Sequence, residues 1–208
     1  MKRVGLPRWL RFRGSGADHP RLTAPSDARA EWARRLEAAL HSLVGQVVTD
    51  TWVWEMALYG PEQAGHFTDP SLEFVQAHVL ELRTADGLTF HISCAQDDDI
   101  WVIALGTVTA ENRLVPDPGQ GTFRTRPMPE FPQGEIRRIK TSPTTGSIQE
   151  IYMMIADREV ILHAGEVEEH MDGRLTVRDQ DECVLIFLDR DAHARTVFNE
   201  PLYRSAHP

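Results

Sequence analysis

Apolar residues near the N-terminus follow the spacing of an amphipathic helix. They are Trp32, Leu36, Leu40 and Leu43, and most positions between them are polar or alanine. Ser26 or Asp27 can cap the first turn, and Gly45 provides the left-handed residue with which helices often end. Because only one face is apolar, we expect this helix to pack on a β-sheet.

From residue 47 onwards the apolar residues recur with a period of two, which is typical of β-strands. Four large side chains are expected to share one face of the first strand, namely Val48, Trp52, Trp54 and Met56, and Asp50 interrupts this apolar face. After a loop at 59–71, the stretches 72–83 and 88–93 predict a hairpin, and an apolar run at 100–105 predicts a further strand.

The loop length of this hairpin follows from parity. A three-residue loop at 85–87 places the apolar residues Leu80, Leu82, Phe90 and Ile92 on one face. A two-residue loop would divide them between opposite faces, so burial favours the longer one. The chosen register sets Glu81 opposite His91 and puts Gly87 at the left-handed bulge position.

The second half of the chain repeats this alternation. We expect strands at 135–141, 149–155, 160–168, 174–178 and 183–188, with a turn at 171–173. A four-residue loop at 156–159 would set Tyr152 opposite His163. A short helix is expected at 190–198, with Asp189 as its cap.

Two parts of the sequence resemble each other. In 84–92 and in 155–164, an Ala-Asp turn leads into a strand with histidine near its start, His91 in one case and His163 in the other. In both halves an acidic stretch then precedes an apolar run. We therefore predict an α+β, β-rich fold, with two related antiparallel β units and an N-terminal amphipathic helix packed on a sheet.

This interpretation divides the chain into four parts. Residues 1–24 are predicted to be a mobile basic arm, 25–111 the helix plus the first β unit, and 135–208 the second β unit with its short C-terminal helix. Residues 112–134 contain five prolines and are predicted to be a Pro/Gly-rich connection. The connection is either a linker or a lid, and a lid would use Phe123, Met128 and Phe131 to close a pocket.

The charge distribution bears on partners. The net charge is −9, and five Lys or Arg residues precede Asp18, so removing their charges leaves −14 for residues 14–208. This strongly negative charge is expected to repel nucleic acid and to favour a basic protein as partner. No stretch approaches the ~18 apolar residues of a membrane span. With two cysteines and no secretory signal pattern, a cytoplasmic location is predicted.

Acidic and histidine-containing segments are candidates for metal binding. The acidic segments are assigned instead to partner binding, through Asp97, Asp98, Asp99, Asp181 and Glu182, because consecutive carboxylates on an extended chain point in alternate directions. The string His163, Glu166, Glu169 and His170 likewise divides between two faces of a regular strand. Gly165 could mark a bulge that re-aims one of these side chains. We expect no bound metal, in particular no structural zinc, and no other cofactor.

Motifs of nucleophilic, phosphate-binding or dinucleotide-binding enzymes are not found, and no catalytic residue is assigned. Three tryptophans and two histidines are candidates for a ligand pocket: Trp52, Trp54, Trp101, His91 and His163. The favoured function is a non-enzymatic cytoplasmic binding or regulatory protein that recognises a basic protein through an acidic surface. The alternatives are a small-molecule sensor with a pocket between the β units, and a hydrolase that uses histidine and acidic-loop residues. Arg137, Arg138 and Lys140 form a small basic cluster, which is weak support for anion binding.

Overall fold

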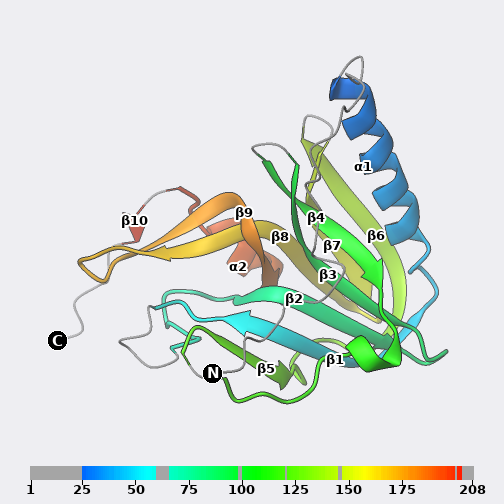
Figure 1. Ribbon diagram of the computed structural model, residues 1–208, viewed down its shortest axis with the longest axis horizontal. Coiled ribbons are helices and arrows are strands. Elements are labelled where there is room, and N and C mark those ends of the chain that lie inside the picture. Colours follow the sequence, from blue (N-terminus) through cyan, green and yellow to red (C-terminus); the bar gives the residue numbers. More distant parts are fainter. Residues whose placement is uncertain are drawn as a thin grey trace, which may run out of the picture.

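The computed structural model describes residues 25–59, 66–97, 100–119, 121–144, 147–199 and 201–202, so the predicted arm 1–24 lies outside the described residues (Figure 1). The helices are α1 (Pro25–His41), the short 3₁₀ turn η3 (Ala110–Asn112) and α2 (Arg190–Arg195). The strands are β1 (Val47–Met56), β2 (Val75–Thr84), β3 (Thr89–Asp97), β4 (Ile100–Thr107), β5 (Phe123–Pro127), β6 (Gly134–Thr144), β7 (Ser147–Ile155), β8 (Arg158–Glu169), β9 (Leu175–Phe187) and β10 (Pro201–Leu202).

The strands form two antiparallel meanders, β1 to β4 and β6 to β9. The meanders are joined twice, because the start of β1 pairs with β6 and the start of β2 pairs with the end of β9. Strands β1, β2, β9, β8, β7 and β6 therefore form a closed ring of hydrogen-bonded neighbours. Figure 1 shows the β8–β9 hairpin extending away from this ring. The predicted β-rich α+β class is confirmed, while the relatedness of the meanders stays a prediction.

The main apolar core is shared between the two meanders. Leu80 and Ile92 from the first lie in the same cluster as Ile151 and Leu162 from the second. Three residues of the N-terminal helical region are buried in it, namely Leu36, Leu40 and Leu43. Helix α1 contacts β4, β6 and β7, so it packs on the sheet as predicted. Within the described residues, no helix is long and apolar enough to cross a membrane.

The β2–β3 hairpin has the predicted register. Glu81 pairs with His91, and residues 85–87 form the loop. Gly87 has a φ of +85°, which residues other than glycine rarely adopt. The pattern was decisive here because both strands bury one continuous apolar face.

The predicted inward-facing residues of β1 are wrong after Val48. A bulge lies between Val48 and Asp50, and it moves the following side chains to the opposite faces. Thr51, Val53 and Glu55 point inward and are buried, whereas the expected residues Trp52, Trp54 and Met56 lie on the outer face, half-buried. A local irregularity of one residue thus reversed the inward face.

The β7–β8 loop is also shorter than expected. Ile155 pairs with Arg158, so the loop is Ala156-Asp157, and Ala156 adopts a φ of +53°. His163 consequently lies opposite Glu150 rather than Tyr152. Loops of two and four residues keep the same faces together, so the apolar pattern could not distinguish them.

The Pro-rich segment 112–134 is partly integrated into the sheet. Strand β5 pairs with β1, and the buried carboxylate of Glu55 accepts hydrogen bonds from Arg124 and Arg126 of this strand. Met128 and Phe131 are buried in the main core, whereas Phe123, the third residue of the predicted lid, lies against Trp54 with a ring-centroid distance of 5.3 Å. The boundaries proposed for the two units stay a prediction.

The end of the chain is close to expectation. The two predicted strands at 174–178 and 183–188 belong to one strand, β9, which is interrupted by a wide bulge. On β8 the same irregularity lies between Ala164 and Gly165, where a bulge was anticipated. Asp189 caps α2 by accepting a hydrogen bond from the Asp191 amide at 2.9 Å, although the helix already ends at Arg195.

Candidate metal centre

Three side chains from three elements converge on the outer face of the second meander. Glu150 of β7 and His163 of β8 are cross-strand partners, and their neighbours Ile151 and Leu162 point into the main core. Helix α2 contacts β8 and β9 on this outer face, where Ala192 is buried against Ile161 and Phe187. That packing brings His193 to the pair.

The distances between the converging atoms match a metal site. His163 Nδ1 lies 3.1 Å from Glu150 Oε1. His193 Nε2 lies 3.4 Å from His163 Nδ1 and 3.4 Å from the same Glu150 oxygen. Ligands bound tetrahedrally to zinc at about 2.0–2.1 Å are separated by about 3.3–3.4 Å. The three atoms therefore have the spacing of one face of such a tetrahedron.

Two further side chains orient these groups. Asp179 Oδ1 lies 2.9 Å from His163 Nε2, so the ring can present Nδ1 to an ion while Nε2 donates to the carboxylate. The Tyr152 hydroxyl donates to the second oxygen of Glu150 at 2.7 Å. Metal-ligating histidines usually have an outer carboxylate or carbonyl of this kind. The contacts of Asp179 with His163 and of Tyr152 with Glu150 therefore resemble those that support the ligands of known metal centres.

Aromatic residues enclose the centre on one side. The Phe198 ring stacks on His163 with a centroid distance of 4.3 Å, and the Phe187 ring meets His193 edge-on at 4.8 Å. The side chain of His163 is 6% exposed, and those of His193 and Glu150 are 15% and 20% exposed. The centre is therefore partly open to solvent.

The charges in the centre stabilise one another. Hydrogen bonds to His163 and then to His193 hold the pKa of Glu150 far below its ordinary value. Burial lowers the pKa of His163, but its contacts with Asp179 and Glu150 outweigh burial and raise the pKa overall. Burial and the Glu150 carboxylate raise the pKa of Tyr152 to about 12, so its hydroxyl stays protonated near neutral pH.

The predicted ligand-binding residues are divided between the two meanders, although Trp52 and His91 both lie against the Arg83–Glu81 pair. Trp52 lies beneath the Arg83 guanidinium, Trp54 contacts His78 and Phe123, and Trp101 packs against the main core. His91 contacts Glu81 on the first meander. Of this predicted set, only His163 belongs to the candidate metal centre.

Neither Glu150 nor His193 was a candidate from the sequence. Glu150 requires the correct β7–β8 loop length, and Asp179 requires the bulge in β9. His193 lies thirty positions beyond His163, in a helix whose only visible signal was its cap. Their convergence is a property of strand pairing and helix packing.

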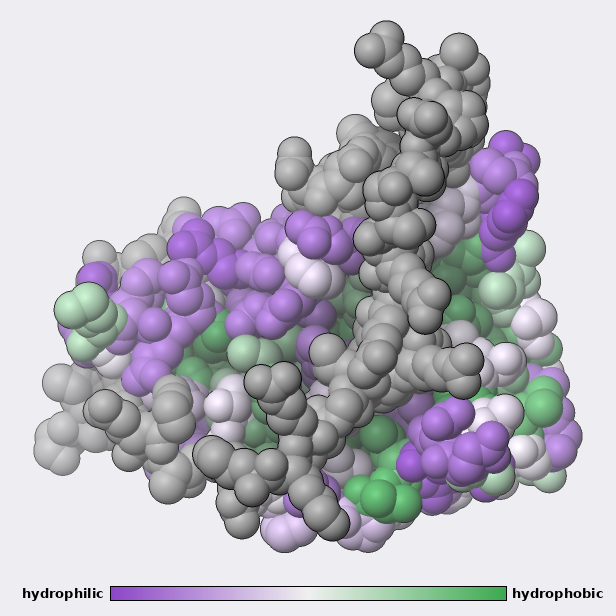
Figure 2. Space-filling view, in the orientation of Figure 1, coloured by the Kyte–Doolittle hydropathy of each residue, from purple (hydrophilic) through white to green (hydrophobic). Residues whose placement is uncertain are grey.

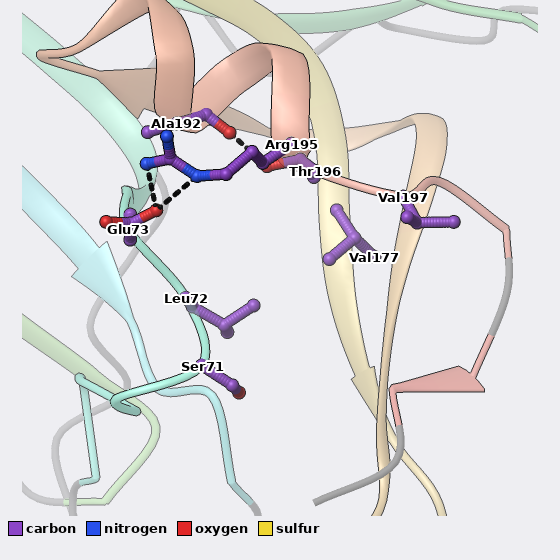
Figure 3. Close-up of a pocket in the computed structure, with 8 residues that line it drawn as sticks. All are labelled: Ser71, Leu72, Glu73, Val177, Ala192, Arg195, Thr196 and Val197. Atoms are coloured by element: carbon purple, nitrogen blue, oxygen red, sulfur yellow. Dashed lines mark hydrogen bonds and ion pairs between the residues drawn. The ribbon is translucent and has the colours of Figure 1, made fainter.

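A small pocket lies between α2, β9 and residues 71–73 (Figure 3). Its volume is about 60 Å³, and its lining includes Leu72, Val177 and Thr196. Arg195 reaches across to Glu73, with an Nη2–Oε2 distance of 2.6 Å. Pockets for drug-sized ligands occupy about 300–1,000 Å³, so this one can hold only water or a very small group.

The acidic residues assigned to partner binding fall into two groups. Asp98, Asp99 and the side chain of Asp97 lie outside the described residues. Asp181 and Glu182 are half-buried in the β9 bulge near Glu166. Burial, followed by the charges of Glu182 and Asp181, raises the pKa of Glu166 to about 7.

Glu166 should therefore make stability depend on pH. The folded state retains a proton that the unfolded chain releases above its ordinary pKa of 4.5. The favourable contribution is complete below that value and is lost as the pH rises through about 7. After allowance for solvent screening, Glu166→Gln should stabilise the fold by about 1–2 kcal/mol at pH 8, and by much less at pH 5.

Urea unfolding at the two pH values measures this difference. Glu111→Gln, which removes an exposed carboxylate from η3, is the matched control and should show no such pH dependence. If Glu166→Gln raised the free energy of unfolding equally at pH 5 and at pH 8, the raised pKa of Glu166 would be contradicted.

Comparisons with family models, with curated proteins and with solved structures found no match to this chain.

Proposed function

We propose that the protein binds a divalent transition-metal ion, for which Zn²⁺ is the reference, through Glu150 Oε1, His163 Nδ1 and His193 Nε2. The triangle formed by these atoms carries the proposal, with distances of 3.1, 3.4 and 3.4 Å. This departs from the expectation of no metal, which assumed that ligands had to come from one stretch of strand. Here each ligand comes from a different element.

The proposed centre supplies three protein ligands, and its side chains are partly exposed. Zinc sites with two histidines and a glutamate leave a fourth position for water or a small ligand. Such a site suits metal-assisted hydrolysis or the binding of a small ligand. An open fourth position favours two of the functions considered from the sequence, the hydrolase and the small-molecule sensor. A purely structural zinc site would have four protein ligands.

Calorimetric titration of chelator-treated protein with ZnCl₂ tests the proposal. We expect one ion per chain. His193→Ala should lose at least a hundredfold in Zn²⁺ affinity, because it removes one of three ligands. The variant should still fold, since His193 lies on the short helix α2, outside the main core. His170→Asn is the matched control, since His170 contacts Thr176 at a different part of the sheet. Absence of Zn²⁺ binding by the folded wild-type protein would refute the proposal.

A second candidate function is recognition of a basic protein, through the carboxylates at the β8–β9 bulge. It is supported by the mutual repulsion of Glu166, Asp181 and Glu182. In Figure 2, hydrophilic residues also cover much of the face that the β8–β9 hairpin presents. The cytoplasmic location remains part of this proposal.

We also propose that the two meanders are related units. Each carries a Glu–His cross-strand pair on its outer face, Glu81 with His91 and Glu150 with His163. The first pair is covered by the backbone around Leu114, and the second by α2. Superposition of β1–β4 on β6–β9 tests this relation, because related units should place the two pairs in corresponding positions.

A further inference from the structure

Two cationic side chains lie on the same outer face as the proposed metal centre. In the β6–β7 ladder, Arg138 pairs with Met154, Lys140 with Tyr152, and Ser142 with Glu150. Directly opposed residues on antiparallel strands point to the same side of the sheet. Lys140 therefore lies beside Tyr152, whose hydroxyl is bonded to Glu150, and Arg138 lies one pair further along.

The cluster is placed outward by a bulge. A register shift between Ile136 and Arg138 lets Ile136 and Ile139 both point into the core, while Arg137, Arg138 and Lys140 are exposed. Among the described residues, Arg138 and Lys140 form no ion pair. The chain has a net charge of −9, so two cations without an ion-pair partner among the described residues form a locally positive patch beside the centre.

Helix α2 adds a third cation at the opposite rim. Within the described part of the chain, the ion pair of Arg190 is a long contact with Glu159, at 3.6 Å, and the Arg190 side chain is 73% exposed. Glu159 pairs with Met154, which lies two residues along β7 from Tyr152 and on the same face, so Arg190 lies near this edge of the centre. The Tyr152–Glu150 edge of the centre is thus flanked by cations from β6 and from α2.

We propose that the small ligand of the metal centre is a phosphate group, with one oxygen at the open metal position and the others facing Lys140 and Arg138. This inference rests on the proposed metal site. Lysine and arginine are the side chains that commonly bind phosphate oxygens, and a divalent ion takes oxygen ligands readily. A carboxylate has only two oxygens, so it could not contact the metal ion, Lys140 and Arg138 each through a separate oxygen.

Protein loaded with Co²⁺, whose visible absorption reports on its ligands, provides the test. Titration with inorganic phosphate, phenyl phosphate and acetate should change the spectrum with either phosphate compound, and at least tenfold more weakly with acetate. The double variant Arg138→Ala/Lys140→Ala should bind Co²⁺ normally but phosphate about tenfold more weakly. The control Arg34→Ala/Arg35→Ala removes the same charge from α1, and should match wild type.

The outcomes separate the two proposals. If folded wild-type protein takes up no Co²⁺, the metal site itself is wrong. If Co²⁺ binds but phosphate compounds leave its spectrum unchanged, or the β6 double variant binds phosphate as tightly as wild type, the phosphate inference is overturned. Binding of acetate as tight as that of phosphate would overturn it as well. Tighter binding of phenyl phosphate than of inorganic phosphate would support it, and would identify phosphate esters as the source.

Discussion

Replacing Glu81 with alanine is expected to destabilise the protein by about 3–5 kcal/mol, because it breaks a buried ion network. The Glu81 side chain is 0% exposed. It accepts hydrogen bonds from Arg83 at 2.7 Å and from the Leu114 amide at 2.8 Å, and its Oε2 lies 2.7 Å from His91 Nε2. Without the carboxylate, these groups lose a partner that water cannot easily replace.

Urea unfolding of Glu81→Ala and Glu81→Gln measures the effect. The glutamine variant keeps an acceptor and should lose clearly less stability than the alanine variant. Glu31→Ala is a matched control, because Glu31 pairs with Arg34 and Arg35 on the surface of α1, and its removal should barely move the midpoint. A wild-type midpoint in Glu81→Ala would contradict the importance of this network.

The same network should contribute to acid sensitivity. Burial alone would raise the pKa of Glu81, but hydrogen bonds involving His91, Leu114 and Arg83 outweigh burial and lower it. The resulting stability is present above the ordinary pKa of 4.5, and it is lost as the pH falls through the lower folded value. Glu81→Gln should therefore flatten the stability curve below about pH 4.5.

Replacing Gly165 with alanine is expected to cost about 2–3 kcal/mol, and to weaken metal binding as well. A Cβ at this position would lie 2.5 Å from the Arg178 carbonyl oxygen and 3.0 Å from Leu185 Cδ1. Since the closest atom belongs to the backbone, the β8–β9 ladder itself must shift. Gly165 pairs with Asp179, so the shift should disturb the contact between Asp179 and His163.

Thermal or urea unfolding, combined with Zn²⁺ titration, tests both consequences. Gly106→Ala on β4 is the matched control, because no atom lies within 4 Å of a Cβ built there. We expect it to change stability by less than about 0.5 kcal/mol. Wild-type stability in Gly165→Ala would show that the bulge tolerates a side chain.

Local sequence patterns determined several elements. The apolar spacing defined α1, and the Asp189 side chain marked the start of α2, although α1 ends at His41, before the predicted stop at Gly45. Parity defined the β2–β3 hairpin, including the contact of Glu81 with His91, because one register alone buries a continuous apolar face. These features depend on residues close together in the chain.

Other features depended on contacts between distant residues. The bulge in β1 exchanged its two faces. Part of the Pro-rich segment formed β5, which pairs with β1 and places Arg124 and Arg126 beside the buried Glu55. Neither the closure of β2 on β9 nor that of β1 on β6 has a local signal, since both link the two meanders.

The candidate metal centre is the clearest case. His163 was a candidate from the sequence, but the string of residues around it was rejected as a metal site because a regular strand divides it between two faces. The structure instead gives His163 partners from β7 and α2, Glu150 and His193. The sequence by itself determined α1, the start of α2, most strands of the two meanders and one member of the centre, His163. Only the tertiary structure decided which of them meet, because strand register and helix packing are set by burial across the whole sheet.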